Sequence, residues 1–138
     1  MRRRATALAG LAALSMTVLA ACNPADPLGG ELGRQPVRVV FFEDDSVALF
    51  DQAKAALEDA ATIARRYPTA PVRVLGFAAP DTDHTPIAGL SRARAQHVAA
   101  ELVSRGVPRA RITVESRGAV AFEAVPIESR RVEIHIGN

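Results

Sequence analysis

Hydrophobic residues recur in this chain at two spacings, one typical of β-strands and the other of α-helices. Apolar and polar residues alternate over residues 111–115 and 131–136, so each of these segments predicts a strand with one buried face. In residues 72–77, Val72, Val74 and Gly76 alternate with Arg73, Leu75 and Phe77, which also suits a strand. Residues 37–42 are rich in β-branched and aromatic side chains and predict another strand. The pattern therefore predicts four strands in all.

Two further segments carry apolar residues at three- and four-residue spacing, which predicts amphipathic helices. The first runs from Leu49 to about Tyr67, and side chains within residues 43–46 are expected to cap it. The second begins with Ser91 as its expected cap and ends before Gly106. The two apolar stripes consist of Ala53, Ala56, Leu57, Ala60 and Ala64, and of Ala95, Val98, Ala99, Leu102 and Val103.

The predicted elements follow in the order β-α-β-α-β-β, with a long loop over residues 118–129 before the last strand. Two helices packed on one face of a four-stranded mixed sheet would bury every apolar stripe. We therefore predict an α+β fold, a two-layer sandwich, in a single domain of residues 37–138. The other face of the sheet is expected to be open and to carry Arg38, Arg73, Arg111, Arg131, Glu133 and His135.

The amino-terminal residues follow a different pattern. A basic start at residues 2–4 and an apolar run at residues 5–20 lead to the sequence Leu-Ala-Ala-Cys, which ends at Cys22. This arrangement is typical of a bacterial lipoprotein signal, in which residues 1–21 are removed and Cys22 is acylated. A transmembrane anchor is the alternative, but the apolar run is short for a spanning helix and contains hydroxyl residues. Residues 22–36 hold three prolines and three glycines and predict a flexible tether.

The signal also accounts for the positive charge of the chain. The sequence holds 17 Lys and Arg against 15 Asp and Glu, a net charge of +2. Three of these arginines and no acidic residue precede Cys22, which leaves 14 basic and 15 acidic side chains, a net charge of −1. A basic excess would favour a nucleic-acid partner, and its loss removes that argument. Because Cys22 is the sole cysteine, the domain must fold without a disulfide.

Several short motifs lie at characteristic places along the predicted elements. The sequence Leu-Ser-x-x-Arg-Ala occupies residues 90–95, and Arg-Arg-Val-Glu-Ile closes the chain at residues 130–134. Further motifs are Phe41-Phe42, Asp45-Ser46, Val74-Leu75-Gly76 and Gly106-Val107. With these motifs, residues 37–137 resemble the OmpA-like periplasmic domain of peptidoglycan-associated lipoproteins and outer-membrane proteins. The resemblance implies a module that binds the diaminopimelate residue of the peptidoglycan stem peptide.

The resemblance assigns Arg94 to the carboxylate of diaminopimelate. A guanidinium suits this task because its planar fork donates two parallel hydrogen bonds to one carboxylate. Arg130, in the closing motif, is expected to assist. A plain alternative for Arg94 is a surface ion pair with Asp81, Asp83 or Glu101.

The chain departs from the family where the ligand's ammonium group would bind. The family has an aspartate at the position of Ala79, and an asparagine at the position of Ile87. Asp81 and Asp83 lie in the same loop and are the candidate acids for the ammonium group. These two replacements do not affect the expected fold, but they weaken the case for diaminopimelate as the ligand.

Other chemistries find little support in the sequence. Residues 81–84 hold two aspartates and a histidine, but a solvated turn explains them, because no second cluster of ligands is visible. Ser91 and His97 fall six residues apart on one helix and therefore point to different sides. We expect no metal, no cofactor and no enzymatic activity.

These patterns together imply a lipid-anchored protein of the cell envelope whose domain faces the periplasm and binds peptidoglycan. Asn23 rather than an aspartate follows Cys22, and resemblance to known lipoprotein sorting then favours the outer membrane over the inner. The second hypothesis is a structural module that has lost the wall ligand and contacts other envelope proteins. Ala79 and Ile87 are the residues that favour it.

Overall fold

The computed structural model describes residues 32–33, 35–43, 46–79, 87–119 and 126–137. The described elements are β1 (Arg38–Phe41), α2 (Asp51–Arg66), β2 (Val72–Ala78), α3 (Ile87–Ser104), the 3-10 helix η1 (Arg109–Arg111), β3 (Ile112–Ala119), the 3-10 helix η2 (Pro126–Ser129) and β4 (Arg131–Ile136). The predicted order of strands and long helices is confirmed.

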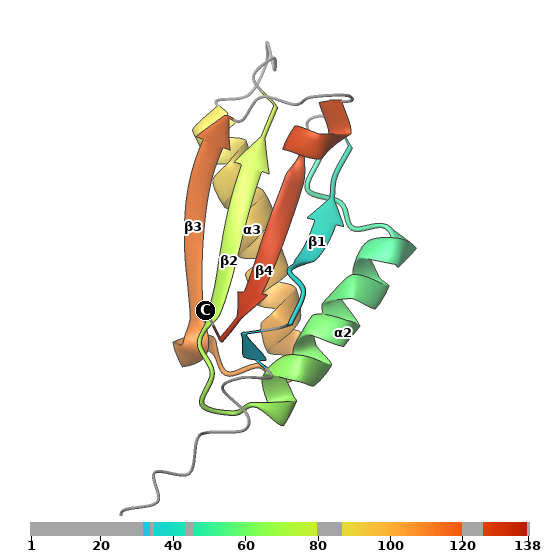
Figure 1. Ribbon diagram of the computed structural model, residues 1–138. Helices are drawn as coiled ribbons and strands as arrows, with labels where there is room; N and C mark the ends of the chain where they lie inside the picture. Colours follow the sequence, from blue (N-terminus) through green and yellow to red (C-terminus); the bar gives the residue numbers. More distant parts are fainter. Residues whose placement is uncertain (1–31, 34, 44–45, 80–86, 120–125, 138) are drawn as a thin grey trace, which may run out of the picture.

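The strands form one mixed sheet in the order β1-β4-β2-β3. Strand β4 runs antiparallel to both of its neighbours, whereas β2 and β3 are parallel. Parallel neighbours need a crossover, and α3 provides it by returning the chain behind the sheet (Figure 1). Helix α2 packs beside it, mainly against β1, so the predicted two-layer α+β fold is confirmed.

The core lies between the sheet and the two helices. Val40, Val74 and Val132 face it from the sheet, and Leu57 and Leu102 face it from the helices. Most residues of the predicted stripes are buried as expected, namely Ala53, Leu57, Ala60, Ala64, Ala95, Val98, Ala99 and Leu102. Ala56 is only partly buried, and Val103 is exposed, with an exposed fraction of 38 %. Val103 lines a groove with Val114 of β3, which is an edge strand of the described sheet.

Both helices begin at residues other than the ones predicted. Helix α3 starts at Ile87, so Ser91 lies inside the helix and the prediction that it caps the helix is wrong. Ser91 is fully buried and its hydroxyl is hydrogen-bonded to that of Ser116 on β3. Helix α2 starts at Asp51, after the residues expected to cap it. The Ser46 hydroxyl instead accepts a local hydrogen bond of 2.9 Å from the backbone N–H of Ala48.

The sheet face turned away from the helices carries paired charges, as predicted for four of the six residues. Arg73 lies 3.2 Å from Glu115 on the neighbouring strand. Glu133 lies 2.7 Å from Arg131 and 3.1 Å from His135. Partial burial raises the pKa of Glu133, but the hydrogen bonds from Arg131 and His135 outweigh this effect and hold the pKa below its ordinary value.

The other two residues, Arg38 and Arg111, do not lie on the open face. Arg38 shares the helix-facing side of β1 with Val40, and its Nε lies 2.7 Å from Asp59 of α2. Arg111 belongs to η1, just before β3 begins. Strand alternation predicts their faces wrongly, because a long arginine at a strand end reaches acceptors on a helix while its stem is buried.

Arg111 caps the carboxyl end of α2. Its guanidinium donates to the backbone oxygen of Ala64 at 2.9 Å, of Tyr67 at 2.7 Å and of Ala70 at 2.9 and 2.7 Å. The last carbonyls of a helix have no partner within the helix, so a cation at this end is favourable. Arg111 therefore fixes the turn between α2 and β2.

Replacing Arg111 by alanine is expected to lower the free energy of unfolding by about 2–4 kcal/mol, because several charge-assisted hydrogen bonds are lost together. Urea unfolding followed by circular dichroism measures the change. Arg117→Ala is the matched control, since Arg117 makes one ion pair of 3.5 Å and its side chain is 54 % exposed. Equal stability of the Arg111 and Arg117 variants would contradict this role.

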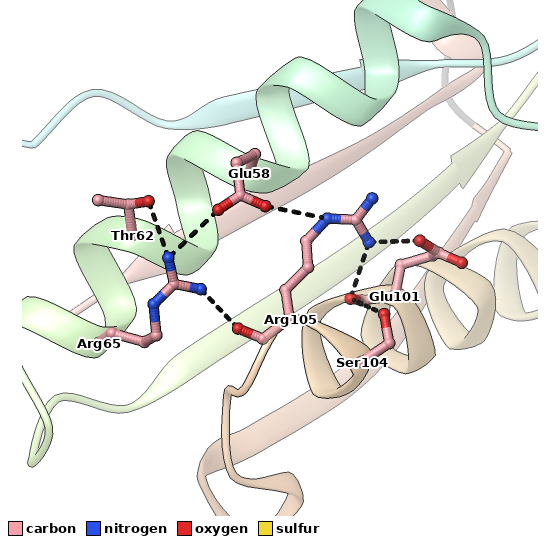
Figure 2. Close-up of polar contacts among 6 residues, drawn as sticks. All are labelled: Glu58, Thr62, Arg65, Glu101, Ser104 and Arg105. Carbon is pink, nitrogen blue, oxygen red and sulfur yellow. Dashed lines mark hydrogen bonds and ion pairs between the residues drawn. The ribbon is translucent and has the colours of Figure 1, made fainter.

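A network of polar contacts joins the two helices at the surface (Figure 2). Arg105, directly after the last residue of α3, is hydrogen-bonded to Glu101 and lies 3.5 Å from Glu58 of α2. Arg65 of α2 lies 3.2 Å from Glu58 and donates to the backbone oxygen of Arg105 at 2.5 Å. The hydrogen bond from Arg105 holds the pKa of Glu101 below its ordinary value. The network ties the end of α3 to α2.

The last part of the predicted tether contacts the domain. Leu32 packs against the core and lies beside Gly137, after the end of β4. Arg38 holds the next residues through hydrogen bonds to the Gln35 side chain at 3.3 Å and to the Pro36 carbonyl at 2.6 Å. The described fold thus lies entirely within residues 32–137.

Candidate functional site

The candidate site lies where β1 and β2 end and where α3 and η2 begin. Figure 1 places all four at the same end of the sheet. The segment after β1, from Ser46 to Phe50, connects this end to α2. We call residues 46–50 the connecting segment.

A close approach of α3 to β2 fixes the first turns of the helix. A Cβ atom on Gly76 would overlap the carbonyl oxygen of Ser91 and lie 2.9 Å from its carbonyl carbon. Glycine is therefore required in β2 for the helix backbone to come this close. The hydrogen bond between Ser91 and Ser116 ties the same turn to β3. Arg94 follows three residues later on a rigidly held helix.

Arg94 is fully buried at this end of the domain. Its Nε donates to the backbone oxygen of Ser46 at 2.9 Å, and its Nη2 donates to that of Glu43 at 2.8 Å. The guanidinium carbon lies 5.2 Å from the centre of the Phe42 ring. The alternative in which Arg94 lies on the surface is therefore wrong. Burial of a guanidinium is costly, and these contacts offset the cost.

His97 contacts the connecting segment one turn further along α3. Its Nδ1 lies 2.7 Å from the backbone oxygen of Val47, and because a carbonyl only accepts, Nδ1 carries the hydrogen. Ser91 and His97 thus bond to different partners, Ser116 and Val47. The contacts give no support to a serine–histidine catalytic pair.

Phe42, whose ring contacts Arg94, also contacts Arg130. The backbone N–H of Phe42 donates to the backbone oxygen of Arg130 at 2.9 Å, and the Arg130 N–H donates to that of Ile127 in η2 at 3.0 Å. The two arginines expected at the site are thus brought to the same end of the sheet, where Arg94 contacts the ring of Phe42 and Arg130 contacts its backbone.

The remaining expected site residues are placed only in part. Ala79, where the resemblance led us to expect an aspartate, is buried directly after β2. Ile87 is the first residue of α3. Asp81, Asp83 and Cys22 lie outside the described residues.

Sequence reasoning missed the acceptors around Arg94 and the contact between His97 and the connecting segment. Backbone carbonyls carry no signature in the sequence. The hydrophobic residues of the connecting segment follow no regular spacing, so the sequence gives no sign of how this segment packs. The sequence did single out Phe42, as part of the Phe41-Phe42 motif. The motif does not predict that its ring lies against the Arg94 guanidinium.

Two further properties concern only the described part of the chain. Its histidine and acidic side chains form no cluster of three or more that would hold a metal ion. Its helices include none that is long and apolar enough to cross a membrane.

The described geometry defines a two-layer α+β domain with a buried arginine where the helix that follows β2 begins. Residues 41–130 match the OmpA family, and the chain belongs to this family. Among functionally curated proteins, no sequence matches it.

Solved structures support the same fold. The peptidoglycan-associated lipoprotein of Burkholderia pseudomallei is 25 % identical, with a TM-score of 0.65 over 72 % of this chain and 89 % of that one. The periplasmic domain of Helicobacter pylori MotB is 23 % identical, with a TM-score of 0.62 over 72 % of this chain and 70 % of that one. The OmpA-like domain of Francisella tularensis FopA1 is 21 % identical, with a TM-score of 0.63 over 71 % and 69 %.

Proposed function

We propose that this protein is a lipid-anchored protein of the cell envelope that binds peptidoglycan non-covalently through its OmpA-like domain. It acts as a binding module without catalysis. The observation that carries the proposal is the buried Arg94, which lies at the start of α3 in a chain of the OmpA family. The likeness to a peptidoglycan-associated lipoprotein supports it.

In this proposal Arg94 binds the free carboxylate of diaminopimelate. The guanidinium already has two main-chain acceptors, the carbonyls of Ser46 and Glu43. A carboxylate carries a full negative charge and can accept two parallel hydrogen bonds from the guanidinium, so it competes well with neutral carbonyls for the same donors. Arg130 assists from the η2 side, and Asp81 or Asp83 accepts the ammonium group.

The anchor is the acylated Cys22, which bears palmitate or a similar chain in the outer membrane. Only nine residues lie between Cys22 and Leu32, which packs against the core. An extended chain of that length spans at most about 35 Å. The domain would therefore stay close to its membrane in the periplasm.

Replacing Cys22 by alanine is expected to abolish the lipid anchor. Metabolic labelling with a palmitate analogue should give no labelled protein, and the chain should leave the membrane fraction. Asn23→Asp is the matched control, because it keeps the cysteine and should change only the membrane in which the labelled protein is found. Labelling of the Cys22→Ala variant at the wild-type level would contradict the lipid anchor.

A second candidate function is an envelope interaction module that keeps the fold without the wall ligand. Ala79 favours it, because a small apolar side chain is buried where the family has its aspartate. An ammonium group without a nearby acid binds poorly in a site shielded from water. Under this proposal other envelope proteins would bind the charged open face of the sheet or the loop before β4.

Co-sedimentation with purified diaminopimelate-type sacculi separates the two functions. Residues 23–138 are the protein to use, since they contain the whole described fold. Saturable pelleting supports wall binding. Negligible pelleting of the folded protein would contradict it and favour the interaction module.

A further inference from the structure

We propose that His97 is a positioning residue for the wall-binding site, which it serves by holding the connecting segment against α3. The inference rests on the proposed function, because it assigns the residue a part in binding the same ligand. It adds a residue that does not touch the ligand but determines the place of the backbone around Arg94.

The geometry that carries the inference is a pair of contacts between α3 and consecutive carbonyls. Arg94 Nε donates to the oxygen of Ser46 at 2.9 Å, and His97 Nδ1 donates to the oxygen of Val47 at 2.7 Å. Residues three apart on a helix lie on the same side of it. Arg94 and His97, which lie one turn apart on α3, therefore both hold the connecting segment against the helix.

The two contacts differ in what happens when a carboxylate arrives. The carboxylate takes up donors of Arg94, so Ser46 and Glu43 lose the cation that holds their carbonyls. The His97 contact uses another side chain and another carbonyl, so it persists. His97 then keeps the segment in place while Arg94 changes partners, and the pocket wall is ordered before the ligand binds.

The connecting segment has few other described anchors. Leu49 packs partly against the core, whereas Val47 and Phe50 are exposed by 38 % and 43 %. The hydrogen bond from Ala48 N–H to the Ser46 hydroxyl lies within the segment and does not attach it to the helix. A segment with so little burial depends strongly on each polar contact to α3.

The Val47 carbonyl is the hydrogen-bond partner that the described structure gives to the imidazole. His97 Nε2 lies 4.0 Å from Glu101 Oε1, which is beyond hydrogen-bond distance, and Glu101 is itself hydrogen-bonded to Arg105. The His97 side chain is 38 % exposed, so the contact through Nδ1 is the one that orients the ring.

Three substitutions separate positioning from packing. His97→Ala removes the donor. His97→Asn restores it, because the Asn amide nitrogen stands at the same number of bonds from the backbone as Nδ1. His97→Gln places its amide near the position of Nε2 and does not restore it. Gln96→Ala is the control, an exposed residue on the same helix.

Binding of residues 23–138 to diaminopimelate-type sacculi is measured by co-sedimentation, and exchange of the Arg94 Nε hydrogen with solvent by NMR. Loss of one hydrogen bond predicts about fivefold weaker binding and about fivefold faster exchange for His97→Ala and His97→Gln. His97→Asn and Gln96→Ala should stay within about twofold of wild type.

The outcomes distinguish this inference from the function on which it rests. If wild type pellets and folded His97→Ala pellets equally well, the inference is wrong and the proposed function stands. If Asn and Gln weaken binding alike, the imidazole acts through packing and the positioning role is wrong. If wild type does not pellet, the proposed function is wrong, and the role of His97 in it falls as well.

Discussion

Replacing Arg94 by alanine is expected to weaken binding to diaminopimelate-type sacculi by about 100-fold, which corresponds to about 2.8 kcal/mol. The reason is that the guanidinium is the cation assigned to the ligand carboxylate, and a shielded charge pair loses most when one partner is removed. Co-sedimentation isotherms of residues 23–138 measure the loss. Arg92→Ala is the matched control, because Arg92 is exposed on the same turn of α3.

A second variant guards against simple unfolding, since alanine also removes the contacts to Ser46 and Glu43. Arg94→Lys keeps the charge and much of the volume but cannot form a two-pronged contact with a carboxylate. We expect it to fold and to bind at least about tenfold more weakly than wild type. Wild-type affinity in a folded Arg94→Lys protein would contradict the assignment.

Replacing Gly76 by alanine is expected to lower the free energy of unfolding by about 3 kcal/mol, the second large effect. The added Cβ meets the backbone of Ser91 rather than a movable side chain, so α3 must shift away from β2. A loss of this size lowers Tm by about 12–24 °C in a domain of this length. Thermal unfolding followed by circular dichroism measures the shift.

Gly118→Ala is the matched control for Gly76. Gly118 has a positive φ of 71°, but a Cβ there meets nothing within 4 Å. Only the cost of the left-handed backbone applies, about 1–2 kcal/mol. An equal or larger loss in Gly118→Ala than in Gly76→Ala would show that the close approach of α3 does not limit the substitution.

Both layers of the fold are predictable from the sequence, because burial imposes a period of two on strands and of about 3.6 on helices. Val74 and Val132 in the sheet, and Leu57 and Leu102 in the helices, obey these periods and lie in the core. Helix starts are less predictable. Ser91 looks like a cap, yet its hydroxyl has a partner on β3 that only the folded chain brings near.

Long cationic side chains are the other limit of prediction from sequence. Alternation places Arg38 and Arg111 on the open face, whereas tertiary acceptors draw one to Asp59 and the other to the end of α2. The same holds at the site. The motif identifies Arg94, but its burial against Phe42 and the carbonyls of the connecting segment depends on contacts across about fifty residues of sequence.

The central claim is that Arg94 recognises the carboxylate by which diaminopimelate differs from lysine. The most direct test is an NMR titration of nitrogen-15-labelled residues 23–138 with a soluble stem tripeptide that ends in diaminopimelate, and with the same peptide ending in lysine. We expect a saturable shift of the Arg94 Nε–H signal with the diaminopimelate peptide alone. No shift with that peptide, or the same shift with both, would contradict it.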